Sequence, residues 1–190
     1  MRRVPTASQT VGPFFSFGLE RPEWADLTGG GKATGENIRI EGHVTDGDGA
    51  PVPDALIEIW QANAAGKYDH PDDRQDKALD PHFRGFGRCA TQADGSFAFT
   101  TIRPGPVSGR GNALQAPHIG VCVLARGLLR HLYTRVYFED CGALNETDPV
   151  LASIEDPARR RSLVARQTAP GTWRFDIRLQ GEGETAFFEV

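Results

Sequence analysis

The segment NIRIEGHVTDGDGAPVPDALIEIWQAN, residues 37–63, decides the fold class of this chain. Its first part alternates apolar and polar side chains from Ile38 to Val44, so the apolar ones share one face of an extended chain. A turn signal at Asp46–Gly49 separates it from a second apolar run, with Leu56 on one face and Ile57 on the other. This pattern is typical of half-buried β-strands, and helical spacing is absent from it.

Similar alternation recurs along most of the chain. It predicts two strands within residues 87–102, around an Asp94-Gly95 turn, and further strands at residues 118–125, 132–138, 172–179 and 185–189. One helix is expected from Asp156-Pro157 through residue 167, because a capping residue precedes a proline, and a shorter one over residues 21–27. We therefore predict an all-β fold, an antiparallel β-sandwich with one or two short helices.

The whole chain, residues 1–190, is expected to form a single domain with an extended N-terminal arm at residues 1–35. Apolar side chains in this arm, such as Val11, Phe14 and Phe17, follow no helical or clean strand period. Left uncovered they would expose an apolar patch, so the arm is predicted to pack on a partner chain.

Composition excludes several classes of function. The formal net charge is −4 with both signs spread along the 190 residues, which leaves no basic stripe for nucleic acid. No stretch approaches the roughly 18 apolar residues of a membrane span, and no secretory leader is recognisable, so a cytoplasmic location is expected. The three cysteines lack the paired spacing of a zinc site or a disulfide framework and are expected to be free thiols.

Five blocks in order along the chain resemble the intradiol ring-cleaving dioxygenases: SQTVGPFF, IEIWQANAAGKY, FGRCATQADGSFAFTTIRPGPV, APHIGVCVLARGLLRHLYTRVYFED and WRFDIRLQGEGETAFFEV. The resemblance implies iron-dependent cleavage of 3,4-dihydroxybenzoate by O2 to 3-carboxy-cis,cis-muconate, in the β-ketoadipate route of aromatic breakdown. It also implies a pseudo-symmetric pair of α and β chains in a hetero-oligomer of αβ units, of which only the β chain holds Fe³⁺.

The resemblance identifies the four positions at which iron-binding members of the family hold Fe³⁺ with two tyrosinates and two histidines. In this chain they are Tyr68, Val107, His118 and Gly120, so one tyrosine and one histidine are missing. A trivalent ion favours anionic oxygen ligands, and one phenol with one imidazole cannot offset its desolvation. We therefore expect no metal in this chain. The expected Fe³⁺ belongs to the partner.

Substitute ligands could in principle come from other histidines and tyrosines, although none lies two residues from His118 or in the matching loop. They are His70, His82, His131, Tyr133 and Tyr137. Each has an ordinary alternative as a packed or hydrogen-bonded residue, and the same holds for Tyr68 and His118.

The resemblance further implies that five residues of this chain line the substrate cavity of the β chain. They are Thr10, Gly12, Pro13 and Phe14 of the arm, and Arg126, which would attract the substrate carboxylate. A surface salt bridge is the competing interpretation of Arg126. Arg135 lies on a predicted strand, and the sequence leaves its role open.

Two other functions stay open at this point. The chain could be a self-sufficient dioxygenase with an altered ligand set, against which Val107 and Gly120 speak. It could also be a non-enzymatic β-sandwich scaffold or binding protein, which would not need the family blocks in this order.

Overall fold

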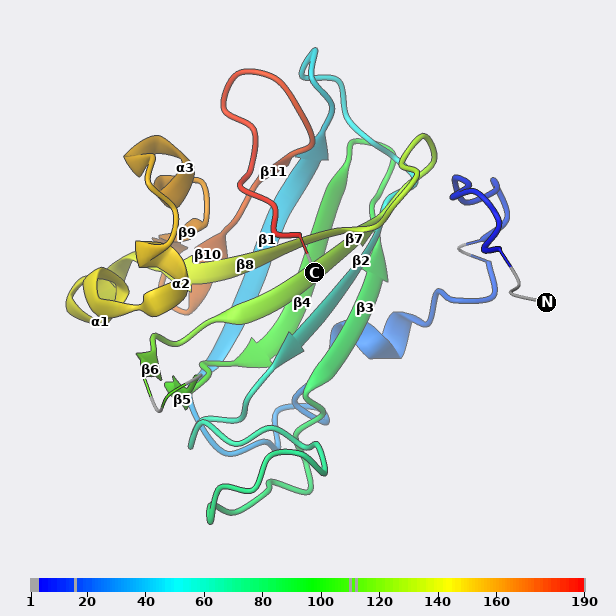
Figure 1. Ribbon diagram of the computed structural model, residues 1–190. Helices are drawn as coiled ribbons and strands as arrows, with labels where there is room; N and C mark the ends of the chain where they lie inside the picture. Colours follow the sequence, from blue (N-terminus) through cyan, green and yellow to red (C-terminus); the bar gives the residue numbers. More distant parts are fainter. Residues whose placement is uncertain (1–3, 16, 110, 112, 190) are drawn as a thin grey trace.

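The computed structural model describes residues 4–15, 17–109, 111 and 113–189, and strands dominate it (Figure 1). In chain order the elements are η1 (Pro22–Ala25), β1 (Asn37–Thr45), β2 (Leu56–Gln61), β3 (Phe86–Ala90), β4 (Ser96–Ile102), β5 (Val107–Ser108), β6 (Leu114–Gln115), β7 (Ile119–Leu124), β8 (Leu132–Phe138), η3 (Glu139–Cys141), α1 (Gly142–Thr147), α2 (Pro149–Ala152), α3 (Pro157–Arg161), β9 (Val164–Ala169), β10 (Thr172–Arg174) and β11 (Ile177–Arg178). The predicted mostly-β structure is confirmed.

Nine of the strands form one connected sheet, in the order β11-β1-β10-β9-β8-β7-β2-β3, with β4 also paired to β1. The short strands β5 and β6 pair only with each other. The expectation of purely antiparallel pairing is wrong. Strand β1 runs parallel to β10 and β11, and β8 runs parallel to β9. Because β9 joins β8 to β10, the described strands do not separate into the two independent sheets of a simple sandwich. Alternation along one strand fixes which face is buried, but carries no information about the direction of its neighbour.

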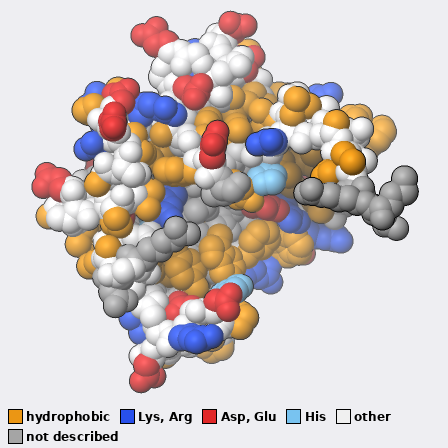
Figure 2. Space-filling view, in the orientation of Figure 1, with side chains coloured by type: hydrophobic (Ala, Val, Ile, Leu, Met, Phe, Trp, Pro, Cys, Tyr) orange, Lys and Arg blue, Asp and Glu red, His pale blue; other side chains and the backbone are white. Residues whose placement is uncertain are grey.

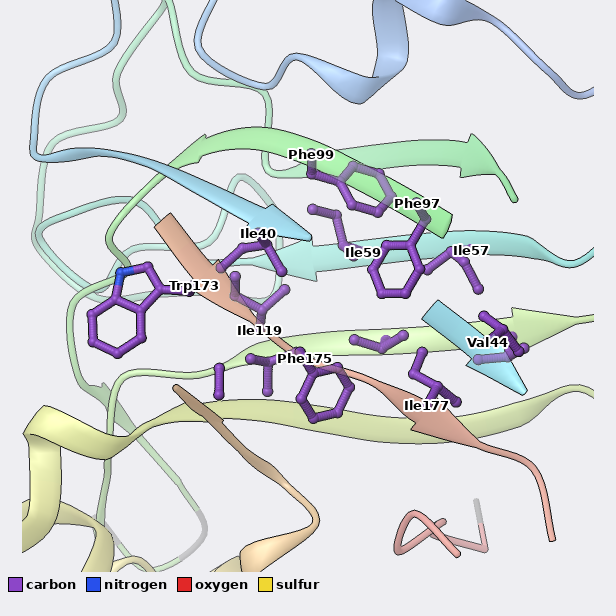
Figure 3. Packing of buried hydrophobic residues seen from close by; sticks show 14 of the residues in the cluster. Ile40, Val44, Ile57, Ile59, Phe97, Phe99, Ile119, Trp173, Phe175 and Ile177 are labelled. Atoms are coloured by element: carbon purple, nitrogen blue, oxygen red, sulfur yellow. The ribbon is translucent and has the colours of Figure 1, made fainter. Parts of the chain in front are cut away.

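The main hydrophobic core lies between β1, β4, β10 and β11 on one side and β2, β7 and β8 on the other (Figure 3). Ile38, Ile40 and Val44 are all buried on one face of β1, as their alternation predicts. Ile57 of β2 and Phe99 of β4 face the same core and are fully buried. Close packing of these side chains holds the β2–β7–β8 layer rigidly, and that layer carries the candidate site.

The predicted turns are present, but they connect distant strands. β1 pairs with β4, and β2 pairs with β3 and β7, so the turn at Asp46–Gly49 does not close a β1–β2 hairpin. The Asp94-Gly95 turn likewise joins two strands with different partners. Gly95 has a φ of +78°, and a Cβ there would lie 2.6 Å from the Val44 carbonyl oxygen, so this turn requires glycine.

The predicted helix at residues 157–167 is too long. Asp156 caps it by accepting a hydrogen bond from the Ala158 amide at 2.7 Å, but the helix ends at Arg161. Residues 164–169 form β9 instead, because the strand pairing of β9 with β8 and β10 overrides local helix propensity. Helices α1 and α2 were not predicted.

Three smaller differences concern the ends of the chain. Residues 172–179 divide into β10 and β11, and residues 185–189 contribute only a single bridge, from Phe188 to Tyr133. The predicted helix at residues 21–27 is the short 3₁₀ turn η1. Among the residues that the structure describes, no helix has the length and apolar character that crossing a membrane requires.

The N-terminal segment has two parts. Residues 22–35 pack on this chain itself: Leu27 is fully buried, and the Trp24 ring packs edge-on against Phe86. Before them, Phe14 and Phe17 contact each other and are 72% and 75% exposed. The described residues before residue 20 are therefore the more exposed part of the arm, and the packing of the arm at residues 1–35 on a partner chain stays a prediction.

Candidate functional site

The two retained ligand-type residues lie together. Tyr68 stands in the loop after β2, where its ring stacks on Trp60 with the centroids 5.9 Å apart. His118 immediately precedes β7, and its Nε2 lies 3.4 Å from the Tyr68 hydroxyl oxygen. Asp73 holds the backbone of Tyr68 in place, because its carboxylate accepts a hydrogen bond from the Tyr68 amide at 2.8 Å. The fold thus brings these two side chains together from segments far apart in the sequence.

Both side chains are held in their neutral forms. His118 is only 5% exposed and donates from Nδ1 to the Ala116 carbonyl at 2.8 Å, which leaves Nε2 as an acceptor for the Tyr68 hydroxyl. Burial lowers the pKa of His118 to about 4, with a further lowering from the positive charge of Arg135. Burial also raises the pKa of Tyr68 above its usual value. At neutral pH the pair is an uncharged phenol hydrogen-bonded to an uncharged imidazole.

The other two positions supply no ligand. Val107 begins the short strand β5 and is buried, with an aliphatic side chain. Gly120 lies in β7 directly opposite Trp60 of β2 and Arg135 of β8. A Cβ at Gly120 would meet only the Trp60 carbonyl oxygen, at 3.3 Å, so a side chain would fit there only after a small shift of that carbonyl, and the sequence provides none.

This set of residues does not fit a ferric ion. Fe³⁺ needs several anionic oxygen or imidazole ligands, whereas here two neutral groups already hydrogen-bond to each other beside a cationic arginine. Among the possible substitutes, His131 packs edge-on against Tyr133, with ring centroids 4.7 Å apart. The described residues contain no group of three or more His, Cys, Asp or Glu side chains that could hold a metal.

A buried polar network adjoins these positions, and the sequence analysis missed its central residue. Asp148 is fully buried and accepts hydrogen bonds from the Ala116 amide at 2.8 Å and the Tyr137 hydroxyl at 3.2 Å. Tyr137 in turn accepts a bond from Nη1 of Arg135 at 3.2 Å, and the same nitrogen donates to Gln115 Oε1 at 2.7 Å. The network orients Arg135, whose role the sequence left open.

The residues predicted to line a partner's cavity gather elsewhere. Thr10 Oγ1 accepts a hydrogen bond from the Gly127 amide at 2.7 Å, which places the arm beside Arg126. Arg126 is half exposed and forms an ion pair with Asp54 through Nε. Val11 is half-buried beside Leu124 and Leu128, and the turn after it is exposed: no atom lies close to Gly12 where a side chain would begin, and Phe14 is exposed. Pro13 lies in the same exposed turn.

These two groups of residues lie at opposite ends of one strand. His118 precedes β7 and Arg126 follows it, which at about 3.3 Å per residue separates their backbones by roughly 26 Å. The arm residues and Arg126 therefore cannot serve the same small ligand as Tyr68 and His118 within this chain.

Comparison with known proteins agrees with this arrangement. A family model described as Dioxygenase matches residues 11–181. The chain belongs to the intradiol dioxygenase family.

Within that family the chain is 41% identical to the protocatechuate 3,4-dioxygenase alpha chain of Pseudomonas putida, over 97% of this chain and 96% of the relative. It is 42% identical to the alpha chain from Burkholderia cepacia, with 97% of both chains covered. The beta chain from B. cepacia is 38% identical over 82% of this chain and 69% of its own length.

Solved structures share the fold. The dioxygenase domain of a dioxygenase carbohydrate-binding protein fusion from Streptomyces sp. SirexAA-E matches with a TM-score of 0.58 at 28% identity, over 96% of this chain and 100% of that domain. The 3-chlorocatechol 1,2-dioxygenase of Rhodococcus opacus matches with a TM-score of 0.62 over 94% of this chain and 69% of the other. At 22% identity the second likeness concerns the fold alone.

Proposed function

We propose that the chain is the non-iron α subunit of a protocatechuate 3,4-dioxygenase, in which a β chain holds Fe³⁺. The complex would cleave 3,4-dihydroxybenzoate between its two hydroxyl-bearing carbons, and both atoms of O2 would enter the product, 3-carboxy-cis,cis-muconate. The bound ferric ion supplies the Lewis acidity that activates the catechol. We place this enzyme in the cytoplasm, where the three free thiols of Cys89, Cys122 and Cys141 would stay reduced.

One observation carries the proposal. The chain matches its alpha-chain relatives over 97% of its length at 41–42% identity, while Val107 and Gly120 remove half of the ligand set and Tyr68 bonds to His118. Conserving the body without the metal ligands is expected of a subunit that contributes surface to a neighbour's site.

The surface that it contributes is proposed to be the arm with Arg126. Thr10 is bonded to Gly127, and the exposed turn of Gly12, Pro13 and Phe14 that follows is available to a neighbour. The hydrogen bonds of the described residues use only Nε of Arg126, so its two Nη groups can receive the carboxylate of 3,4-dihydroxybenzoate. An arginine at the cavity wall would attract the anionic substrate and fix which end of it faces the iron.

Iron content of the chain with and without a partner tests this proposal. Purified alone, the chain is expected to be colourless and inactive. Co-purified with the β-type chain of its own source, it should give one iron per αβ unit, the absorption band of tyrosinate-bound Fe³⁺ and ring cleavage. Tyr68→Phe and His118→Gln in this chain should leave the iron content of the complex unchanged. Stoichiometric ferric iron in the isolated chain, lost on those substitutions, would overturn the proposal.

A further inference from the structure

On three neighbouring strands, three residues stand side by side, and the middle one is a glycine with no side chain. Trp60, Gly120 and Arg135 stand opposite one another on β2, β7 and β8. Residues directly opposite in paired strands point to the same face of a sheet, so Trp60 and Arg135 flank the position where Gly120 has no side chain. If Gly120 carried a Cβ, the one atom within 4 Å of it would be the Trp60 carbonyl oxygen, at 3.3 Å.

The gap forms part of a cavity of about 510 Å³ on the outer face of β2, β7 and β8. Its walls are largely apolar and include four aromatic side chains, those of Trp60, Phe86, Tyr133 and Phe188. In Figure 2, which views this side of the molecule, hydrophobic side chains gather in a hollow near the centre of the surface. A volume of this size suits a small molecule with one ring.

Arg135 supplies the cavity with a positive charge that no carboxylate pairs directly. Its Nη1 donates to two neutral oxygens, of Gln115 and Tyr137, and no ion pair of the described residues includes it. Asp148 is reached only through the Tyr137 hydroxyl.

Neither of the two carboxylates in the cavity wall forms an ion pair with Arg135. Glu58 is paired with Arg88, and Glu189 is exposed at the rim. A guanidinium held in place by neutral partners in an apolar wall is a favourable site for an anion, because its remaining donors are already oriented.

We propose that this cavity binds small aromatic carboxylates without a metal, with the ring against Trp60 and the carboxylate on Arg135. The fixed arginine would supply the positive charge of the site, so hydroxyl groups on the ring would add little to affinity. This inference does not rest on the subunit role proposed above, and the chain purified by itself can be tested for it.

Calorimetric titration in buffer containing EDTA provides the test, with benzoate, 3,4-dihydroxybenzoate and benzamide as probes. The two acids are expected to bind with dissociation constants within about threefold of each other. Benzamide, which has the same shape without the charge, should bind at least about tenfold more weakly. Equal affinity for benzamide and benzoate would overturn the proposal, as would a requirement for added metal.

Two substitutions locate the binding. Arg135→Gln should weaken benzoate binding by about tenfold or more, whereas Arg166→Gln, which removes the same charge from the exposed part of β9, should have no effect. Because Arg135→Gln also alters the bonds to Tyr137 and Gln115, Gly120→Leu serves as a second variant that fills the cavity and leaves Arg135 in place. Benzoate binding that survives in both folded variants would show that the cavity is not the site.

Discussion

Tyr68 and His118, 50 residues apart in the sequence, meet with the phenol oxygen 3.4 Å from Nε2. Each satisfies a buried polar atom of the other, and the second nitrogen of His118 is bonded to the Ala116 carbonyl. Their presence is therefore accounted for by packing and hydrogen bonding, with no need of a metal. This relationship leads to the first prediction.

The stability of the chain should fall in a defined acidic range because of His118. Its pKa is about 4 in the folded chain, and an unfolded histidine titrates near 6.5, so the unfolded state binds more protons between these values. The contribution of His118 is complete above about pH 6.5 and is lost as the pH falls toward 4, by up to about 3 kcal/mol. Urea unfolding of wild type and His118→Gln at several pH values measures it. Parallel pH dependences for the two proteins would contradict the assignment.

Asp148 is expected to be among the most sensitive positions for stability. Besides Ala116 and Tyr137, its carboxylate accepts from the amides of Val150 and Leu151 at 2.8 and 2.9 Å, where it caps α2. Asp148→Ala leaves these buried donors unpaired and should lower the free energy of unfolding by about 3–5 kcal/mol. Asp148→Asn keeps one accepting oxygen and should lose clearly less. Equal losses, measured by chemical denaturation, would show that the carboxylate oxygens are not what matters.

The arm should loosen when its hydroxyl anchor is removed. Thr10→Val keeps the shape of the side chain but removes the acceptor for the Gly127 amide, whereas Thr10→Ser retains it. Hydrogen exchange at Gly127 should become about fivefold faster in the valine variant, in line with the loss of about 1 kcal/mol, and stay near wild type in the serine variant. If valine and serine variants exchange at the same rate, the bond does not hold the arm.

Arg126 should affect substrate binding in the assembled αβ enzyme and leave iron loading unchanged. Arg126→Ala removes a half-exposed cation, and the KM for 3,4-dihydroxybenzoate is expected to rise about tenfold, with a smaller change in kcat. The Arg126→Lys variant keeps the charge, and its KM should lie between those of the wild-type enzyme and Arg126→Ala. Arg166→Ala is the matched surface control. Unchanged steady-state kinetics in Arg126→Ala would remove this residue from the substrate site.

The strands could be predicted from sequence because their signal is local. The run at residues 132–138 coincides with β8, and the apolar face of Ile38, Ile40 and Val44 is buried as expected. The direction of pairing could not be predicted, since the parallel partners are distant in sequence: Arg39 pairs with Thr172, and Tyr137 with Val164. The sequence of strand β9 favours a helix because its residues follow a genuine helix start at Asp156.

For the site, the family resemblance located Tyr68 and His118 but not the bond between them, which depends on the loop after β2. Asp148 was overlooked although it precedes Pro149 as a helix cap, the same signal that was recognised at Asp156. The orientation of Arg135 follows from Tyr137 and Gln115, and no short motif records contacts of that kind.

The parallel pairing of β1 with β10 and β11 has a consequence for biosynthesis. Arg39 stands opposite Thr172 and Val44 opposite Ile177, so one edge of β1 stays unsatisfied until residues 172–178 have left the ribosome. In a nascent chain, β1 therefore waits for residues more than 130 positions downstream before this edge is paired. Premature termination anywhere before β10 would leave an open strand edge, and such truncated products should be prone to aggregation and degradation.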